Sequence, residues 1–333
     1  MPLVSIIVPC YNEQATIRLL LDAIVGQTVP NRDIEVIIAD GRSTDQTREI
    51  VTAFQCDHPD LLVRLIDNPQ RNISAGLNCA LSAADGRYII RLDAHSVPTP
   101  AYVATCIEDL EAGRGENVGG VWQIRPGGAG LMPSAISLAA AHPLGVGDAL
   151  YRYATEPGYV DTVPFGAFRR EVFERFGQFD ETLLSNEDYE FNARLRQGGG
   201  RVWLDPRIRS AYFARSSLSA LGKQYWRYGY WKLRMLRRYP KTLRFRQAAP
   251  PVFVISLIVL LLSSLWFSLA WRLLAAELIV YFLALAVGSL KPARRAGSAG
   301  LLLAIPLAIA TMHLSWGAGF LWSFFGSFIK RVK

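Results

Sequence analysis

Short apolar runs alternate with amphipathic stretches over the first 93 residues of the chain. The apolar runs are rich in Val, Ile and Leu, which is typical of buried parallel strands, and the stretches between them repeat apolar residues at helical spacing. Strands are predicted at 3–9, 34–39, 61–66 and 86–92, and helices at 12–27, 43–54 and 74–84. This alternation predicts an α/β fold with a mostly parallel sheet, whose ligand crevice lies at the carboxyl ends of the strands.

The pattern is less regular after residue 98. Helices are predicted at 99–110, 134–141, 169–176 and 185–197, and strands at 117–124, 160–165 and 201–204. The helices that begin at 43 and 185 open with Ser43-Thr44-Asp45-Gln46 and Ser185-Asn186-Glu187-Asp188, which both fit a capping box. The Gly-rich stretch 145–158 predicts a mobile lid.

The C-terminal part predicts membrane segments. The stretches 252–271, 273–290 and 298–329 are long enough to cross a bilayer and contain one charged residue, Glu277. The last stretch, interrupted by Pro306, Gly317 and Gly319, predicts either one tilted helix or a hairpin. Before these spans, 217–239 predicts an amphipathic helix, and one of its faces carries Leu218, Leu221, Tyr225, Tyr228 and Lys232.

Charge separates the two ends of the chain. Residues 206–333 hold 19 Lys and Arg against the single acid Glu277, a net charge of +18, which leaves −10 for residues 1–205 of the overall +8. Nine basic residues and no acid fall between 223 and 246, which favours an anionic lipid surface over nucleic acid as the partner of this helix. Lys291, Arg294 and Arg295 place their loop, and with it the catalytic part, on the cytoplasmic side.

These features predict three parts: a cytoplasmic α/β domain at 1–215, a basic interfacial helix at 216–249, and a membrane domain at 250–333. Lys330, Arg331 and Lys333 would also prefer the cytoplasmic side, which favours a hairpin or a re-entrant segment at 298–329. The N-terminus has no charged region of the kind that opens a signal peptide. The chain has no Cys-x-x-Cys, and Cys10, Cys56, Cys79 and Cys106 are expected to be reduced core thiols.

The stretch Arg91-Leu92-Asp93-Ala94-His95 carries the main candidate chemistry. It follows the fourth predicted strand, and side chains two residues apart on a strand point the same way. Asp93 and His95 can therefore converge on one divalent metal ion that holds a diphosphate. Imidazole is a softer ligand than carboxylate, which favours Mn²⁺ or another transition metal over Mg²⁺. A hydrogen-bonding role is the alternative for His95.

Four motifs in this order resemble those of the family 2 glycosyltransferases, which have the GT-A fold. They occupy residues 4–13, 39–45, 91–95 and 185–188, and the resemblance extends over about 3–232. The Asp-Ala-His variant and the trailing membrane spans are similar to the bacterial exopolysaccharide subgroup of succinoglycan-type glucosyltransferases. The resemblance implies a Rossmann-like nucleotide-sugar-binding domain, followed by an interfacial amphipathic helix and C-terminal transmembrane helices.

The resemblance implies roles for residues at the strand ends. Pro9, Tyr11 and Glu13 would line the nucleoside pocket, and Asp40 would accept a hydrogen bond from the base. A strand-end turn is the structural alternative for Asp40, and a plain helix cap is favoured for Ser43. Asp93 and His95 would hold Mn²⁺ or Mg²⁺ across the donor's diphosphate, because a divalent ion stabilises the charge that develops on this leaving group.

The resemblance also implies an acceptor side. Asp188 would be the general base that takes the proton of the acceptor hydroxyl, and Glu187 would support acceptor binding or structure. A capping role in the first helical turn is the structural alternative for Asp188. Gly166 would let the backbone approach the sugar.

A further motif lies in the predicted interfacial helix. Gln224, Arg227 and Tyr228 resemble the Gln-x-x-Arg-aromatic motif of membrane synthases, in which the Arg meets a diphosphate and the aromatic ring stacks at the acceptor. Interfacial anchoring alone explains the same residues equally well.

Together, the resemblance implies an inverting hexosyltransferase that moves glucose or another hexose from a UDP-sugar to a polyprenyl-diphosphate-linked saccharide in exopolysaccharide biosynthesis. It would act at the bacterial cytoplasmic membrane, with its catalytic domain in the cytoplasm. The expected partners are membrane lipid and other polysaccharide-assembly proteins, and no nucleic acid. The alternatives are transfer directly to polyprenyl phosphate, a processive polysaccharide synthase, and a non-catalytic membrane scaffold.

Overall fold

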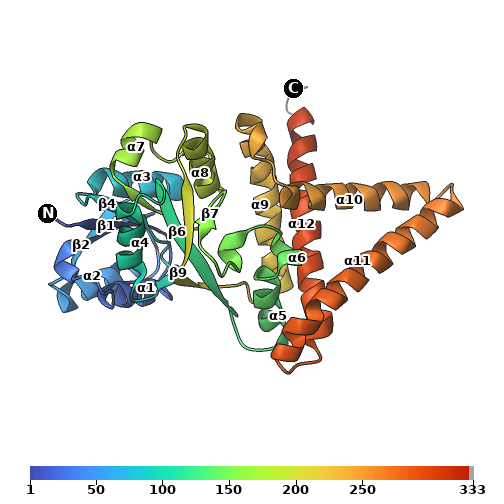
Figure 1. The fold of residues 1–333 in the computed structure, drawn as a ribbon, viewed down its shortest axis with the longest axis horizontal. Coiled ribbons are helices and arrows are strands. Elements are labelled where there is room, and N and C mark those ends of the chain that lie inside the picture. The colour runs from blue at the N-terminus through green and yellow to red at the C-terminus, as the bar shows by residue number, and fades with distance from the viewer. Residues whose placement is uncertain (330–333) are drawn as a thin grey trace. The chain divides into compact units, whose positions relative to one another are not determined.

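The computed structural model describes residues 1–329, whose course is shown in Figure 1. These residues form two compact units. The first contains Met1–Gln123 and Tyr153–Tyr212, and the second contains Ile124–Arg152 and the residues from Phe213 on. The segment 124–152, which we expected within the catalytic domain, therefore belongs to the second unit.

One sheet organises the first unit. Its parallel half has the strand order β3-β2-β1-β4, formed by β1 (Val4–Cys10), β2 (Ile34–Asp40), β3 (Leu62–Asp67) and β4 (Tyr88–Arg91). The sheet continues beyond β4 with β8 (Ala167–Arg169), β6 (Asn117–Arg125), β9 (Val202–Phe213) and β5 (Val97–Pro98), and β7 (Gly158–Tyr159) pairs with β9. The predicted mostly parallel α/β sheet is thus confirmed.

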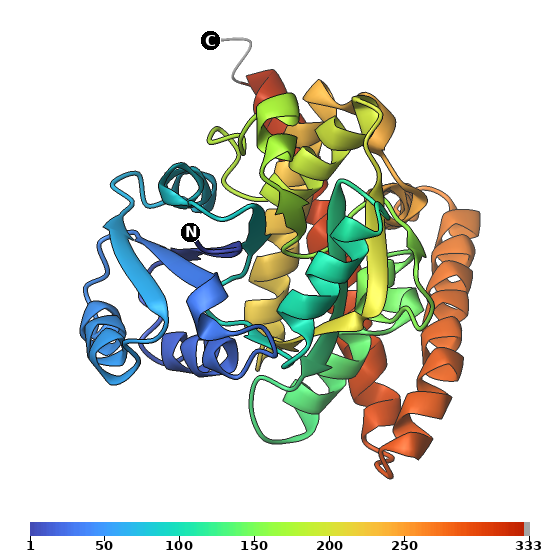
Figure 2. The ribbon, with the colours of Figure 1, turned by 60° about the vertical axis from the view of Figure 1, so that its left-hand side comes forward.

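Helices cover both faces of the parallel strands. In Figures 1 and 2, α1 (Ile17–Val25) and α2 (Thr47–Asp57) lie on one face and α3 (Ile73–Ala83) on the other. The apolar positions that predicted α1 are fully buried, and burying each Leu or Ile contributes roughly 1.5–3 kcal/mol. The unit also contains α4 (Tyr102–Glu111), α7 (Glu171–Phe176) and α8 (Glu187–Gln197).

The cysteine prediction holds in part. The four cysteines are unpaired, and Cys10 and Cys106 are buried, whereas Cys56 is exposed and is no core thiol. Burial and the nearby carboxylates of Asp40 and Glu13 raise the pKa of the Cys10 thiol well above its usual range. This thiol is therefore protonated and unreactive at neutral pH.

Two strand predictions were wrong. Residues 160–165 form no strand, because Pro164 has no N–H and Phe165 has a φ of +64°. The strand predicted to stop at residue 204 instead runs through Pro206 to the end of β9. The Asp205 carboxylate accepts a hydrogen bond from the N–H of Arg207 (2.7 Å), which holds the chain extended past the proline.

The second unit consists mainly of helices. They are α5 (Leu131–Ala140), α6 (Pro143–Val146), α9 (Leu218–Arg238), α10 (Phe245–Ser263), α11 (Ser268–Arg295) and α12 (Leu301–Ile329). Among the described residues, α10, α11 and α12 are the three helices that are long and apolar enough to cross a membrane. The predicted C-terminal apolar helices are therefore present.

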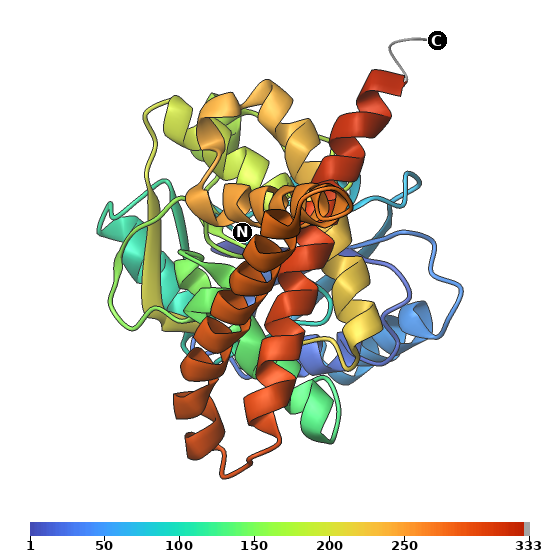
Figure 3. The ribbon, with the colours of Figure 1, turned by 90° about the vertical axis from the view of Figure 1, so that its right-hand side faces the viewer.

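The boundaries of these helices differ from the prediction. The first span was expected to end at 271, but α10 ends at Ser263, where the Ser264 hydroxyl donates to the carbonyl of Leu261 (2.7 Å) and competes with helical hydrogen bonding. The basic cluster at 291–295 lies in the last turns of α11 rather than beyond it. Residues 301–329 form one helix instead of a hairpin, as Figure 3 shows. The basic residues at 330–333 lie outside the described residues.

Helix α9 packs closely along α12. The Ser217 side chain caps α9 by accepting a hydrogen bond from the N–H of Ala220 (3.3 Å). A Cβ at Gly229 would lie 2.1 Å from the Trp316 carbonyl oxygen, and one at Gly319 would lie 2.2 Å from the Trp226 carbonyl oxygen. Glycines therefore allow the two backbones to touch, as in close helix pairs within membranes.

The predicted apolar face of α9 is the packed face. Leu221, Tyr225 and Lys232 are buried, and Leu218 and Tyr228 are half-buried. The basic side chains Lys223, Arg227, Arg234, Arg237 and Arg238 are exposed.

Part of the Gly-rich stretch 145–158, which we predicted to be a mobile lid, has regular structure. It contains the last residues of α6 and a short 3₁₀ helix (Leu150–Arg152). Asp148 forms ion pairs with Arg244 and Arg246, and the Arg152 guanidinium donates to the carbonyl of Ala140 (3.3 Å). These bonds tie residues 148–152 to the helices of the second unit.

Candidate active site

The ends of β2 and β3 meet at one arginine. Asp40 is fully buried, and its carboxylate accepts hydrogen bonds from the N–H and hydroxyl of Ser43 and from Arg48 (2.8 Å). The same Arg48 nitrogen lies 2.9 Å from Asp67 Oδ1. The hydrogen bond to Asp67 and the charge of Asp40 raise the pKa of Arg48, although partial burial opposes the shift. Both carboxylates are thereby held at the carboxyl end of the sheet.

The predicted cap at Ser43 was wrong. The Ser43 hydroxyl donates to Asp40 Oδ1 (2.5 Å) instead of capping a helix, and α2 begins only at Thr47. There Asp45 Oδ1 accepts hydrogen bonds from the backbone N–H (3.1 Å) and the hydroxyl (2.5 Å) of Thr47. The residues that resembled a helix start instead bind the loops together.

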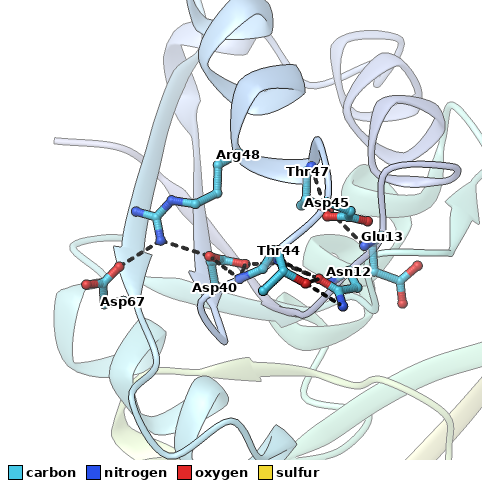
Figure 4. A network of polar contacts seen from close by, with 9 residues as sticks. Asn12, Glu13, Asp40, Thr44, Asp45, Thr47, Arg48 and Asp67 are labelled. Carbon is cyan, nitrogen blue, oxygen red and sulfur yellow. Dashed lines mark hydrogen bonds and ion pairs between the residues drawn. The ribbon is translucent and has the colours of Figure 1, made fainter.

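The loops after β1 and β2 interlock, as Figure 4 shows. Asn12 donates its N–H to Ser43 Oγ (2.8 Å), and its side-chain oxygen accepts the N–H of Thr44 (2.8 Å). Glu13 donates its N–H to Thr47 Oγ1 (2.8 Å). Asn12 has a φ of +54°, a conformation that asparagine tolerates better than most residues. These hydrogen bonds hold the two loops together at the carboxyl end of the sheet.

The predicted nucleoside residues lie around these loops. Pro9 is half-buried in β1 next to Ala39 of β2, and Tyr11 is 46% exposed. The guanidinium of Arg71 lies 6.0 Å from the centroid of the Tyr11 ring. An exposed aromatic face beside a cation can stack on a base and attract an anionic ligand.

His95 and Glu13 are brought together across the loops after β4 and β1. His95 Nδ1 lies 3.1 Å from Glu13 Oε1, and Thr16 donates its hydroxyl to Glu13 Oε2 (2.5 Å). The His95 side chain is 46% exposed and the Asp93 side chain 26% exposed, so both face solvent rather than an apolar core.

Asp93 and His95 supply ligand types that suit a divalent ion. Among residues 1–329, no group of three or more His, Cys, Asp or Glu side chains is placed to hold a metal alone. Ions such as Mg²⁺ are commonly held by one or two protein ligands together with water and substrate phosphates. Asp93 and His95 supply a carboxylate and an imidazole from one loop, and the Glu13 carboxylate contacts the imidazole ring. This arrangement matches that pattern.

The Arg91 guanidinium contacts the carboxylates of Asp93, Glu187 and Asp188. This residue ends β4 and is 2% exposed. Its guanidinium lies 3.0 Å from Asp93 and 2.9 Å from Glu187, and it also donates to Asp188. Burial alone would lower the pKa of Arg91, but the charges and hydrogen bonds of Asp93 and Glu187 raise it. The structure thus brings the donor-side Asp93 and the predicted base Asp188 onto one cation.

The start of α8 differs from a capping box. The helix begins at Glu187, and the residue before it, Asn186, has a φ of +69° and makes no side-chain cap. The predicted capping box is therefore wrong, although Asp188 does lie in the first turn of α8, where the helix dipole favours an acid. Its carboxylate is directed to Arg91 and its side chain is 25% exposed.

A strained turn lies behind Arg91. Phe165 and Gly166 have φ values of +64° and +99°, and the Gly166 carbonyl accepts the N–H of Arg91 (3.0 Å). A Cβ on Gly166 would lie 2.6 Å from Asn117 Oδ1, so the close approach here is to Asn117 within the fold. Strain of this kind is commonly kept at functional sites.

Comparison with known proteins identifies the family. The family described as "Glycosyl transferase family 2" matches residues 5–177. The chain belongs to glycosyl transferase family 2. The succinoglycan biosynthesis protein ExoA of Rhizobium meliloti (strain 1021) is 31% identical, over 98% of this chain and 96% of its own length.

Other relatives agree with this assignment. A Methanococcus voltae protein named as a dolichyl N-acetyl-α-D-glucosaminyl phosphate 3-β-D-2,3-diacetamido-2,3-dideoxy-β-D-glucuronosyltransferase is 28% identical over 72% of this chain and 75% of its own length. The solved mannosyltransferase PcManGT of Pyrobaculum calidifontis, in complex with GDP-Man and Mn²⁺, superposes with a TM-score of 0.64 at 20% identity, over 97% of this chain and 87% of its own. The glycosyltransferase therefore has the expected GT-A fold.

Sequence reasoning assigned no role to four residues of the candidate site of this glycosyltransferase. They are Arg48, Asp67, Arg71 and Arg91. Asp67 ends a strand, as Asp40 does, and this position was an available signal. The arginine at position 91, in an otherwise apolar strand, was a second available signal, because a buried cation requires acidic or polar partners.

The predicted diphosphate motif lies in the second unit of the glycosyltransferase. Gln224 Nε2 donates to the hydroxyl of Tyr228 (2.8 Å), and Arg215 Nε lies 3.4 Å from Gln224 Oε1. Arg227 is exposed on the basic side of α9.

Proposed function

We propose that this glycosyltransferase is an inverting hexosyltransferase that moves glucose or another hexose from a UDP-sugar to a saccharide linked to polyprenyl diphosphate. The observation that carries this proposal is the shared contact of Asp93 and Asp188 with Arg91. This contact supports the proposal because the two acids that we assign to the donor and to the acceptor share one cation. Both side chains keep a quarter of their surface exposed, 26% and 25%, so each can meet a ligand.

The chemistry requires one base and no covalent intermediate. The Asp188 carboxylate takes the proton of an acceptor hydroxyl as that oxygen attacks the anomeric carbon of the donor sugar. The bond between the anomeric carbon and the phosphate oxygen breaks, and its electron pair leaves with the nucleoside diphosphate. Attack opposite to the leaving group inverts the configuration at the anomeric carbon. Glu187, which is buried against Arg91, supports this arrangement.

The donor side is assigned to the strand-end loops. Asp40 and Tyr11 would bind the nucleoside, with Pro9 and Glu13 beside them. Asp93 and His95 would hold a divalent ion, Mn²⁺ in preference to Mg²⁺ because one ligand is imidazole. When bound, this ion would stabilise the negative charge of the departing diphosphate.

The acceptor class is supported by the relatives and by the second unit. The Rhizobium meliloti relative is named for succinoglycan biosynthesis, and the name of the Methanococcus voltae relative describes transfer to a lipid-linked sugar. The three long apolar helices and the exposed basic residues of α9 suit a protein that works at an anionic membrane surface. We therefore propose a role in exopolysaccharide biosynthesis, with the catalytic unit on the cytoplasmic face and Gln224, Arg227 and Tyr228 at the acceptor diphosphate.

One experiment tests this function directly. Membranes that contain the full chain are incubated with UDP-glucose, UDP-galactose, UDP-GlcNAc or GDP-mannose, with polyprenyl-diphosphate saccharides or polyprenyl phosphate, and with or without Mn²⁺. Products are measured by mass spectrometry, and membranes with Asp188→Asn serve as the control. Addition of one hexose to the lipid-linked saccharide from a UDP-sugar is expected. Transfer to polyprenyl phosphate alone, a polymer, or no product with any pair would contradict the proposal.

A further inference from the structure

Arg91 is an unusual residue to find inside the sheet. Its position in β4 pairs with Ile7 of β1, and its N–H bonds to the Gly166 carbonyl on the other side. The strand residues before it are apolar and fully buried. Burying a guanidinium in such a place is costly unless charged partners surround it. Its partners therefore indicate why the sequence keeps it there.

Those partners come from two distant parts of the chain. One terminal nitrogen of Arg91 lies 3.0 Å from Asp93 and 2.9 Å from Glu187, and the other donates to Asp188. Asp93 follows β4 directly, whereas the two acids of α8 are 96 and 97 residues away. The planar guanidinium fixes the directions of its hydrogen bonds, which an ammonium group cannot do.

The three acids that contact Arg91 also lie close enough together to need a positive charge among them. Three acidic side chains surround one guanidinium, so the acids outnumber the cation, and this excess would favour a divalent cation beside the partly exposed Asp93. Without the guanidinium, the same carboxylates would repel one another in a partly buried site. The Arg91 side chain is 2% exposed and its guanidinium is directed to the three acids, whereas Asp93 and Asp188 each keep about a quarter of the side chain exposed.

We propose that Arg91 is a positioning residue that holds Asp93 toward the donor and Asp188 toward the acceptor, so that the two halves of the site are aligned before either ligand binds. This inference rests on the proposed function for the roles of the two acids. It adds that the alignment depends on the fork of one buried guanidinium. Preorganised groups of this kind act without reorganising when the ligands react.

The first test measures transfer by the full chain in membranes. Arg91→Lys keeps the charge but loses the fork, and we expect it to lower kcat about 100-fold, within the range of general-base contributions. The double variant with Asp188→Asn should be no slower than Asp188→Asn alone, since both changes disable the same group. The matched control is Arg170→Lys, whose guanidinium bonds backbone carbonyls at Gly86 and Ala84 (2.7–2.9 Å); its kcat should stay within about threefold of wild type.

The second test does not depend on transfer. Carboxyl groups of the full chain are labelled with a carbodiimide and glycine ethyl ester, and each site is quantified by mass spectrometry. We expect Arg91→Lys to raise labelling of Asp93 and Asp188 severalfold and Arg170→Lys to leave it unchanged. If wild type transfers no sugar from any donor, the proposed function fails, and the labelling still decides whether Arg91 positions the acids.

Each remaining outcome also decides the matter. Near-wild-type kcat in Arg91→Lys, losses that multiply in the double variant, or unchanged labelling at both acids would overturn the proposal. If Arg91→Lys does not fold, the labelling is repeated with Arg91→Gln. Failure of both variants to fold would show that Arg91 stabilises the sheet instead of positioning the acids, and would also overturn it.

Discussion

His95 Nδ1 lies 3.1 Å from Glu13 Oε1, which joins the loop after β4 to the loop after β1. A carboxylate behind an imidazole fixes the orientation of the ring and raises its basicity, as commonly found for histidines that bind metals. The same contact is compatible with a purely structural histidine, because Glu13 also anchors Thr16. The metal preference of the transfer reaction distinguishes a His95 that binds metal from a His95 that is only structural.

Replacement of His95 should change which metal supports transfer. In His95→Asp a second carboxylate replaces the imidazole, and we expect the ratio of transfer rates in Mn²⁺ and Mg²⁺ to fall about tenfold, because oxygen ligands suit Mg²⁺ better. Glu13→Gln should raise the Mn²⁺ concentration needed for half-maximal activity about 10-fold or more. The measurement is the initial rate against the concentration of each metal. An unchanged ratio in His95→Asp would remove His95 from the metal site.

Asp188→Asn should stop transfer while nucleotide binding survives. An amide cannot accept the proton of the acceptor hydroxyl, so a loss of about 10²–10⁴ in kcat is expected. Calorimetric titration with UDP and Mn²⁺ should give a Kd within about threefold of wild type, because the donor loops are held by their own bonds. Asp180→Asn, at an acid outside the candidate site whose carboxylate accepts hydrogen bonds from Thr182, is the control. Transfer at the wild-type rate in Asp188→Asn would exclude Asp188 as base.

The parallel strands of the sheet could be predicted because each is a continuous apolar run. Such a run is sufficient to indicate a strand that is buried on both faces. Asp40 and Asp93 could be placed at one edge for the same reason, since parallel strands end together. At the start of α8 the capping box failed because Asn186 makes no side-chain cap. The one at Ser43 failed because its hydroxyl has a second possible partner, the Asp40 carboxylate. Short polar side chains bond equally well to a neighbouring loop, and only the folded chain decides between these partners.

The meeting of Asp188 with Arg91 could not be predicted from spacing. The two residues are 97 positions apart, and their contact depends on where α8 packs. The sequence did contain one clue, the arginine within an apolar strand. It indicates that acids must surround this position, but not which of the 28 Asp and Glu residues do so.

Arg48 should affect donor binding more than turnover. It bridges Asp40 and Asp67 at 2.8 and 2.9 Å, so Arg48→Gln leaves two carboxylates without their cation at the nucleoside end of the site. We expect the KM for the UDP-sugar to rise about 10-fold with kcat within threefold, since the base is untouched. Arg18→Gln is the matched control, because its ion pair with Asp22 is exposed and such pairs contribute about 0–1 kcal/mol. A fall in kcat without a change in KM would contradict the assignment.

The glycine contact between α9 and α12 should not tolerate a methyl group. In Gly229→Ala the new Cβ would lie 2.1 Å from the Trp316 carbonyl oxygen, so the helices must separate. Overpacking of this kind costs about 1–3 kcal/mol and should lower the Tm of the full chain in detergent. Gly326→Ala is the control, since a Cβ there meets nothing within 4 Å. Equal Tm values for the two variants would show that α9 does not pack along α12.

The buried acid Asp109 should make stability depend on pH. Burial and the charge of Asp205 raise the pKa of Asp109 to about 6, although Arg207 opposes the shift and Glu108 adds to it. The usual Asp pKa is near 3.8, so between pH 4 and pH 6 the folded state binds more protons than the unfolded state. Stability is therefore lost as pH rises through this window.

Asp109→Asn removes that dependence and keeps the shape of the side chain. We expect it to raise the free energy of unfolding by about 3 kcal/mol at pH 7.5, because the pKa is raised by about two units and each unit corresponds to about 1.4 kcal/mol. The gain should shrink as pH is lowered toward 4.5, where the wild-type acid is itself protonated in the fold. The measurement is the Tm of both proteins in detergent across this range. A difference that is constant, or that grows at low pH, would show that Asp109 is ionised in the folded protein throughout.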